Sequence, residues 1–278
     1  MWANRDWVGR YFPAGLPTGG ELEAYAKWCN AVEGNTTFYA LPKRTAVERW
    51  ATQVPGDFRF LLKLPRTITH DRRLRNAEAE LAEALDRFEP LGDVMGPVSI
   101  QLPGSFGPED VAVLDRFLAR LPQDFSWGVE VRHPDFSNGD HQERTINDLL
   151  FGHGVNRIII DTRAFFAGPS LTPAEQEATH RKPRLPVRAV ATADQPVVRF
   201  VGQTDAAPNP GFWARWVTTV AGWIDQGKRP IFFAHTPDNA VSPALCRQFH
   251  DQVAEVVDGL TPLPDPHAPA PGDQLEIF

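Results

Sequence analysis

Charged and amide side chains follow one short apolar run after another along this chain. Ten of these side chains are our candidates for substrate binding: Asn35, Lys63, Arg66, Gln101, Arg132, His133, Arg163, Arg199, His235 and Asn239. Four of them are arginines, and the planar guanidinium group holds phosphate or carboxylate through two parallel hydrogen bonds. If the fold gathers these side chains, they predict a site for an anionic substrate that carries phosphate or carboxylate.

The candidates for catalysis are Glu33, Glu130, His70 and Asp161. Carboxylates that lie beside arginines and away from water acquire separated pKa values, which suits Glu33 and Glu130 to general acid/base catalysis. The structural alternative is equally open, because such carboxylates also serve as tethers for neighbouring arginines. The number of charged strand ends favours function, since a core gains little from several desolvated ion pairs.

A divalent metal is the less favoured alternative for the same residues. His70, His133 and His235 would supply nitrogen ligands and the nearby carboxylates oxygen ligands. No HxxH or HExxH spacing supports such a site, and the local arginines would repel a cation, so no metal site is predicted. The chain has no Gly-rich phosphate loop, dinucleotide fingerprint or serine nucleophile elbow, and no cofactor is predicted.

The elements that must position these residues are short strands that alternate with amphipathic helical patterns, which is typical of a parallel sheet. Strands are expected at 31–34, 58–64, 97–102, 127–131, 157–161, 196–201 and 230–234. The predicted fold is a single (β/α)₈ TIM-type barrel, with a doubly wound open sheet as the alternative. The carboxyl ends of barrel strands open on one mouth, which would bring the charged residues together.

The connection between Asp161 and Pro196 is rich in proline and contains the basic run "HRKPRLPVR". We expect a long loop here, with one helical piece near 174–178. Aromatic residues expected near the mouth are Trp7, Phe38, Tyr39, Phe136, Phe165, Phe166 and Phe212. Phe165 and Phe166 open the long loop and are the best candidates for stacking on a sugar or base, although core packing is the alternative for each.

Five motifs carry a resemblance to a known family: "VEGNTTFYALP", "KLPRTITH", "LGDVMGPVSIQLP", "VEVRHPDF" and "FFAHTPDN", in this order and spacing. The chain resembles the YecE family, a domain-of-unknown-function family, from about Trp2 to about Val257. The resemblance implies a TIM-barrel-like fold and no settled activity. Family members begin with a strand that carries a "G-x-x-x-W" stretch, whereas this chain opens at "MWANRDW". Strand one is therefore expected to be truncated or missing.

The net charge, the cysteine count and the distribution of apolar residues exclude several classes of protein. The net charge of −7 argues against bulk nucleic-acid binding, although it leaves room for a local basic pocket. Cys29 and Cys246 lie far apart without a CxxC pair, so neither a disulfide framework nor structural zinc is expected. We see no signal peptide and no membrane span, and we expect a cytoplasmic protein.

One barrel domain is expected over 1–259, followed by a Pro-rich flexible tail over 260–278 that ends in "QLEIF". The tail resembles the short peptides through which bacterial replication and repair proteins bind the sliding clamp. Its candidate partner-binding residues are Gln274, Leu275, Ile277 and Phe278. A tail that folds back on its own barrel is the alternative.

Two hypotheses follow from these observations. The first is an enzyme that acts on an anionic substrate at the barrel mouth, with a phosphodiester hydrolase of the DNA-repair type as one form of it. The second is a DNA-transaction accessory protein without catalysis, recruited to the sliding clamp through "QLEIF".

Overall fold

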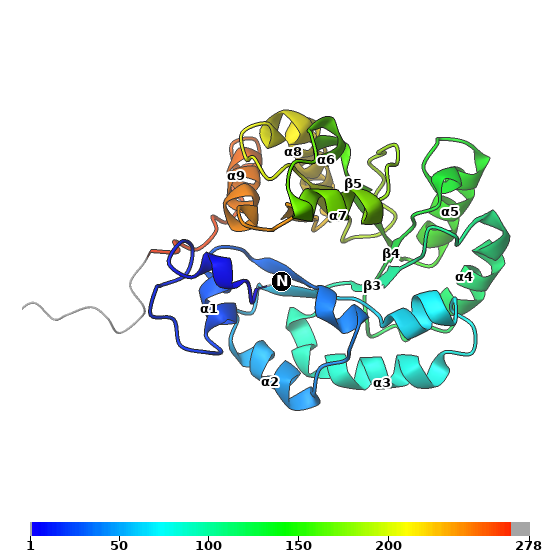
Figure 1. Cartoon of the computed structure of the whole chain (residues 1–278). Helices are drawn as coiled ribbons and strands as arrows, with labels where there is room; N and C mark the ends of the chain where they lie inside the picture. The colour runs from blue at the N-terminus through cyan, green and yellow to red at the C-terminus, as the bar shows by residue number, and fades with distance from the viewer. Residues whose placement is uncertain (1, 268–278) are drawn as a thin grey trace, which may run out of the picture.

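The computed structural model of the chain describes residues 2–267 (Figure 1). These residues contain seven strands: β1 Ala31–Gly34, β2 Arg59–Leu62, β3 Val98–Gln101, β4 Trp127–Glu130, β5 Asn156–Asp161, β6 Val197–Val201 and β7 Ile231–His235. Each of them overlaps a strand expected from the sequence. All paired neighbours are parallel, in the orders β1-β2 and β3-β4-β5-β6-β7. The α/β class with parallel sheets is confirmed.

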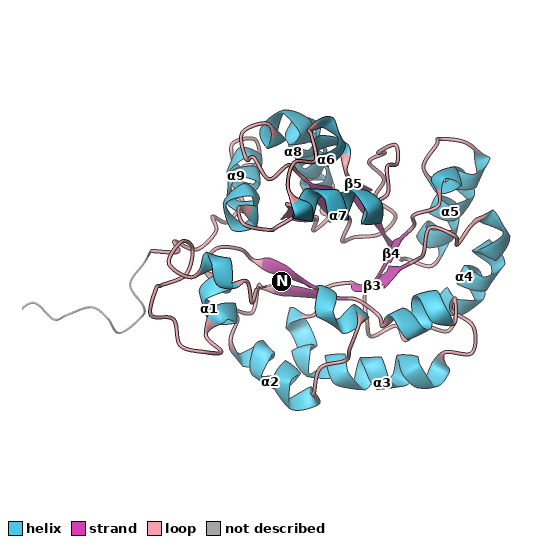
Figure 2. Cartoon of the chain, viewed as in Figure 1, coloured by secondary structure: helices cyan, strands magenta, loops and turns pink. Residues whose placement is uncertain are grey.

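Helices join the strands and surround them (Figure 2). The α-helices are α1 Glu21–Ala26, α2 Arg44–Thr52, α3 Glu78–Phe88, α4 Val111–Leu118, α5 His141–Gly152, α6 Arg163–Ala167, α7 Pro173–Arg181, α8 Asn209–Asp225 and α9 Ser242–Ala254. Every residue of β3, β4, β5 and β6 is buried. Such burial on both faces is typical of parallel strands that helices cover.

The connection after β5 contains more helix than the sequence predicted. The helical piece expected near 174–178 lies within α7, and α6 is an additional helix. Thr172 and Glu175 form a capping box at the start of α7, in which each side chain accepts a hydrogen bond from the other residue's backbone N–H. Such a cap stabilises the first turn of a helix.

The expectation of a closed barrel is not confirmed. Between the two sheets, β2 and β3 are linked by isolated bridges that pair Lys63 with Ser99 and Phe60 with Met95. At the other side β1 and β7 lie in contact, but residues 2–267 form no backbone ladder between them. The strands follow one another in sequence order without the reversal that a doubly wound sheet requires.

Residues 2–20 contain no strand in the part of the chain that the structure describes. They begin with the 3₁₀ turn η1 Arg5–Trp7, which brings Trp7 into the core. The Trp7 ring stacks on Tyr25, and its Nε1 donates a hydrogen bond of 2.9 Å to the Asn239 carbonyl in the loop after β7. This segment therefore joins α1 to the loop after β7 by side-chain packing rather than by strand pairing.

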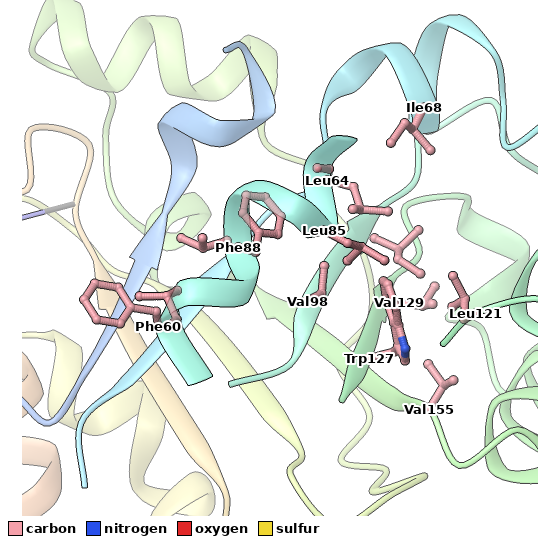
Figure 3. Close-up of a cluster of buried hydrophobic side chains, with 14 of the residues drawn as sticks. Phe60, Leu64, Ile68, Leu85, Phe88, Val98, Leu121, Trp127, Val129 and Val155 are labelled. Atoms are coloured by element: carbon pink, nitrogen blue, oxygen red, sulfur yellow. The ribbon is translucent and has the colours of Figure 1, made fainter. Parts of the chain in front are cut away.

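The most populous apolar cluster within residues 2–267 extends from Trp7 to Val155, and Figure 3 shows the part of it around α3, β3 and β4. Phe88 of α3 and Val98 of β3 are fully buried, with Trp127 and Val129 of β4 beside them. Each such side chain contributes about 1.5–3 kcal/mol by leaving water. The cluster holds β3 and β4 in fixed positions, and with them the polar residues at their carboxyl ends.

None of the helices within residues 2–267 combines the length and the apolar character that a bilayer-spanning helix needs.

Candidate functional site

A buried arginine joins two carboxylates that are distant in sequence. Arg199 projects from the middle of β6, and its Nη2 donates a hydrogen bond of 2.9 Å to Glu33 Oε2 of β1. Its Nε lies 2.5 Å from Glu33 Oε1, and its Nη1 donates a bond of 2.6 Å to Glu130 Oε2 of β4. All three side chains are buried. Arg199 thus connects β1, β4 and β6 across the interior of the fold.

Two further cations approach the same carboxylates. Arg132 Nε donates a hydrogen bond of 2.6 Å to Glu130 Oε1. Lys63 Nζ donates a bond of 2.9 Å to Gln101 Oε1 and lies 3.8 Å from Glu33 Oε1. Lys63 directly follows β2, and Gln101 ends β3. The predicted convergence of these strand ends is therefore present in the structure.

The carboxylates are held in their ionised form. Burial raises the pKa of Glu33, but Arg199 and Lys63 outweigh it and bring that pKa well below its ordinary value. Burial likewise raises the pKa of Glu130, while Arg132 and Arg199 lower it to about 2. Because both groups are ionised at neutral pH, neither is a ready proton donor. This electrostatic arrangement favours the tether alternative over an acid/base pair.

The two lysines and the histidine around them are harder to protonate than usual. Burial and the charge of Arg199 lower the pKa of Lys63 to about 7. The same two causes lower the pKa of Lys182 to about 8. Burial lowers the pKa of His235 to about 3, although Glu33 opposes that shift, so its ring is neutral. Within residues 2–267, the buried His235 Nε2 has no hydrogen-bond partner and lies 3.6 Å from Glu33 Oε2.

A pocket of about 320 Å³ opens over these residues. The predicted site residues among its lining are Asn35, Lys63, Gln101, Arg132, Arg199, His235 and Asn239. They come from the ends of β1, β2, β3, β4 and β7 and from within β6. The pocket therefore lies at the carboxyl ends of the parallel strands, where barrel-type folds carry their sites.

Helix α7 and the residue after it supply a wall that the sequence did not assign. Glu177, Arg181 and Lys182 line the pocket, and Arg181 forms an ion pair of 2.6 Å with Glu177. The available signal was the basic run "HRKPRLPVR", in which Arg181 and Lys182 stand. Its place in a long irregular connection gave no indication of which of its cations would face the site.

A sequence model of the family described as "Protein of unknown function DUF72" matches residues 1–270. The chain belongs to the DUF72 family. It is 39% identical over 264 residues to "UPF0759 protein YecE" of Escherichia coli (strain K12), a match that covers 95% of this chain and 94% of the relative. The protein of the same name from Escherichia coli O157:H7 matches with the same identity and coverage. The resemblance to the YecE family is confirmed.

Solved DUF72 structures share the fold of this chain. A DUF72 family protein from Enterococcus faecalis V583 superposes with a TM-score of 0.64 at 20% identity, over 83% of this chain and 93% of that one. A DUF72 family protein from Thermotoga maritima MSB8 also superposes with a TM-score of 0.64, at 18% identity, over 91% of this chain and 96% of that one. At these identities the likeness concerns the fold alone.

Three of the residues predicted for the site of this DUF72 chain do not line the pocket. Asp161 is buried, and its Oδ2 accepts hydrogen bonds of 2.8 Å from Arg163 Nη2 and from Trp216 Nε1 of α8. Arg163 is taken up by this pair and lines a separate hollow with Phe166. Phe165, a candidate for ligand contact, is buried against Phe166. The structure therefore brings none of Asp161, Arg163 and Phe165 to the pocket.

Three other predicted residues, Arg66, His133 and His70, do not line the pocket. Arg66 is exposed, and its Nη2 donates a hydrogen bond of 3.1 Å to Asp71. His133 accepts a hydrogen bond from the Asp135 backbone and caps the short turn after β4. The His70 ring contacts Phe38 edge to face, with a ring separation of 4.9 Å. Burial, assisted by Arg132, lowers the pKa of His70.

The predicted partner-binding residues Gln274, Leu275, Ile277 and Phe278 lie outside the described residues. Just before them, Pro264 accepts a hydrogen bond of 2.9 Å from Arg247 of α9, and His267 contacts Trp28. No group of three or more His, Cys, Asp and Glu side chains within residues 2–267 is arranged to hold a metal ion.

Proposed function

We propose that the pocket binds an anionic ligand that carries phosphate or carboxylate. The observation that carries this proposal is the excess of positive charge around the pocket. Glu33 and Glu130 face Arg199 and Arg132, and Glu177 faces Arg181. Lys63 and Lys182 also line the pocket, and burial together with the charge of Arg199 makes it costly to protonate either of them.

A bound anion would offset that cost. It would stabilise the protonated form of Lys63 and Lys182 and accept hydrogen bonds from Arg132, whose Nη groups are not needed for Glu130. Arg199 has the different role of a fixed tether, because both its Nη groups already donate to carboxylates. We therefore assign anion contact to Lys63, Arg132 and Lys182.

We further infer that the seven strands of residues 2–267 form an open β/α barrel around this site. Sequence-ordered parallel neighbours, the bridge between Lys63 and Ser99, and the side-chain contact of Glu33 with Arg199 support that inference. In such a barrel, the side-chain contacts of Glu33 of β1 with Arg199 of β6 and His235 of β7 stand in for backbone pairing between β1 and β7.

The test is calorimetric titration of the full chain at pH 6.5 with inorganic phosphate and with citrate. The wild type should bind at least one of them, and Arg132→Gln and Lys182→Gln should each weaken binding about tenfold, since a hydrogen bond to a charged group contributes about 1.5–3 kcal/mol. Lys43→Gln is the matched control, because Lys43 is an exposed lysine that does not line the pocket. Failure of the wild type to bind either anion would refute the proposed function.

The anionic group can belong to a small molecule or to a nucleic-acid backbone. The net charge of −7 supports a small molecule. Binding of a labelled DNA duplex that weakens steeply with salt would instead support a protein that acts on a phosphodiester, and release of a labelled fragment would assign a hydrolase of the DNA-repair type.

Recruitment to the sliding clamp is a second proposal, and it rests on the sequence "QLEIF" alone. Glutamine would supply a polar anchor, and Leu275, Ile277 and Phe278 would fill an apolar groove. Deletion of 274–278 should abolish co-purification with the clamp, while Arg132→Gln should not affect it. Retention of the clamp by the deletion variant would overturn this proposal.

A further inference from the structure

Two aromatic side chains stand at the edge of the cationic pocket. Phe38 ends the 3₁₀ turn η2 Asn35–Phe38, which directly follows β1, and Tyr39 is the next residue. Both line the pocket together with Lys63 and Arg132. The apolar and the cationic parts of this surface therefore belong to one site.

The Tyr39 ring is unusually open to water for so large an apolar group. Tyr39 is 71% exposed, whereas aromatic rings of this size are normally packed against neighbouring side chains. It is nevertheless held in place, because it contacts Phe38 edge to face at a ring separation of 5.1 Å, and Phe38 contacts His70 in turn. A supported aromatic face that remains exposed beside a binding site is suited to stacking on a planar ring.

Amide groups complete the polar part of the surface. Asn35, Gln101 and Asn239 line the pocket. Asn239 adopts a left-handed backbone conformation, with φ of 57°. Its carbonyl oxygen accepts the hydrogen bond from Trp7 Nε1, which holds this loop in place. Amide side chains both donate and accept hydrogen bonds, which suits them to the polar edge of a heterocycle or a sugar.

We propose that the ligand of this pocket carries a planar ring as well as an anionic group, as a nucleoside monophosphate or an aryl phosphate does. The inference rests on the proposed function, since it uses the same cationic residues for the anion. The anionic group lies among Lys63, Arg132 and Lys182, and the ring stacks on Tyr39. The volume of about 320 Å³ lies at the lower end of small-molecule sites, which fits one such molecule.

The experiment compares three ligands by calorimetry at pH 6.5: inorganic phosphate, phenyl phosphate and adenosine 5′-monophosphate. Stacking of one ring contributes about 1–3 kcal/mol, so at least one ring-bearing ligand should bind about 5- to 150-fold more tightly than phosphate. Tyr39→Ser should remove most of that preference and leave the affinity for phosphate unchanged. Tyr39→Phe should keep the preference, because it retains the ring.

The matched control is Phe151→Ser, which removes a ring of similar exposure, 72%, on α5 away from the pocket. It should leave all three affinities unchanged. A preference for the nucleotide over phenyl phosphate would assign the ligand as a nucleotide, and equal preference would assign an aryl phosphate. If phosphate binds but neither ring adds affinity, or if Tyr39→Ser keeps the preference, the ring inference is wrong and the anion site stands. If no ligand binds, the proposed function fails with it.

Discussion

Replacement of Lys63 by methionine should change how the stability of the protein depends on pH. Lys63 is 5% exposed, and burial together with Arg199 lowers its pKa from 10.5 to about 7. The folded protein therefore releases a proton from Lys63 that the unfolded chain retains between pH 7 and pH 10.5. Stability rises with pH in this interval, because the unfolded state binds more protons than the folded state.

The size of the effect follows from the pKa difference. One pKa unit corresponds to about 1.4 kcal/mol. Protonated Lys63 therefore costs the folded state up to about 5 kcal/mol below pH 7, and this cost disappears as the pH rises toward 10.5. Methionine has a similar length and no charge, so Lys63→Met removes the cost at every pH. The stability of the wild type relative to this variant should rise by about 1.4 kcal/mol for each pH unit between pH 7.5 and 9.5.

Urea denaturation of both proteins at pH 6, 7.5, 8.5 and 9.5 measures this difference. Lys43→Met is the control, because Lys43 is exposed at the start of α2 and its loss changes the net charge equally. Stability curves of wild type and Lys63→Met that run parallel over this range would refute the reasoning. That result would mean that Lys63 is fully charged in the pocket and that the excess positive charge is already compensated.

Three further predictions concern the same network and its surroundings. Glu130→Gln should lower the free energy of unfolding by about 3–5 kcal/mol in urea denaturation, because Arg199 stays buried with one carboxylate fewer. Asp161→Asn should lower the free energy of unfolding by about 1–3 kcal/mol, because it weakens the hydrogen bonds with Trp216 and Arg163. Calorimetry should show that this variant binds phosphate as tightly as the wild type does. Weaker phosphate binding would place Asp161 in the site. Sulfate, which does not titrate in this range, should bind about tenfold more weakly at pH 8 than at pH 6, because Lys63 loses its proton near pH 7. A pH-independent sulfate affinity would contradict the assignment of that lysine to the anion.

The sequence identified much of the site because parallel strands place their carboxyl ends together. Lys63, Gln101 and Arg132 each stand at or shortly after the end of a strand, and the structure brings them to one pocket. The same rule misplaced Asp161, which also ends a strand. Its pairing with Trp216 of α8 depends on helix packing that periodicity alone cannot specify.

The features that sequence could not supply depend on long-range geometry. The pairing of Arg199 with Glu33 spans 166 positions and requires β1 and β6 to face each other across the fold. The expected closed barrel is absent from residues 2–267 because side chains, not a backbone ladder, connect β1 to the later strands. Lys182 reaches the pocket only because α7 folds over it, and the helical piece predicted near 174–178 did not indicate which of its residues would face the site.

A crystal structure of the protein soaked with tungstate, located by its anomalous signal, tests the anion site most directly. The predicted result is a tungstate ion within hydrogen-bonding distance of Lys63 Nζ, Arg132 and Lys182, with Arg199 still bound to Glu33 and Glu130. Tungstate that binds elsewhere and leaves this pocket without anomalous density at saturating concentration would contradict the account.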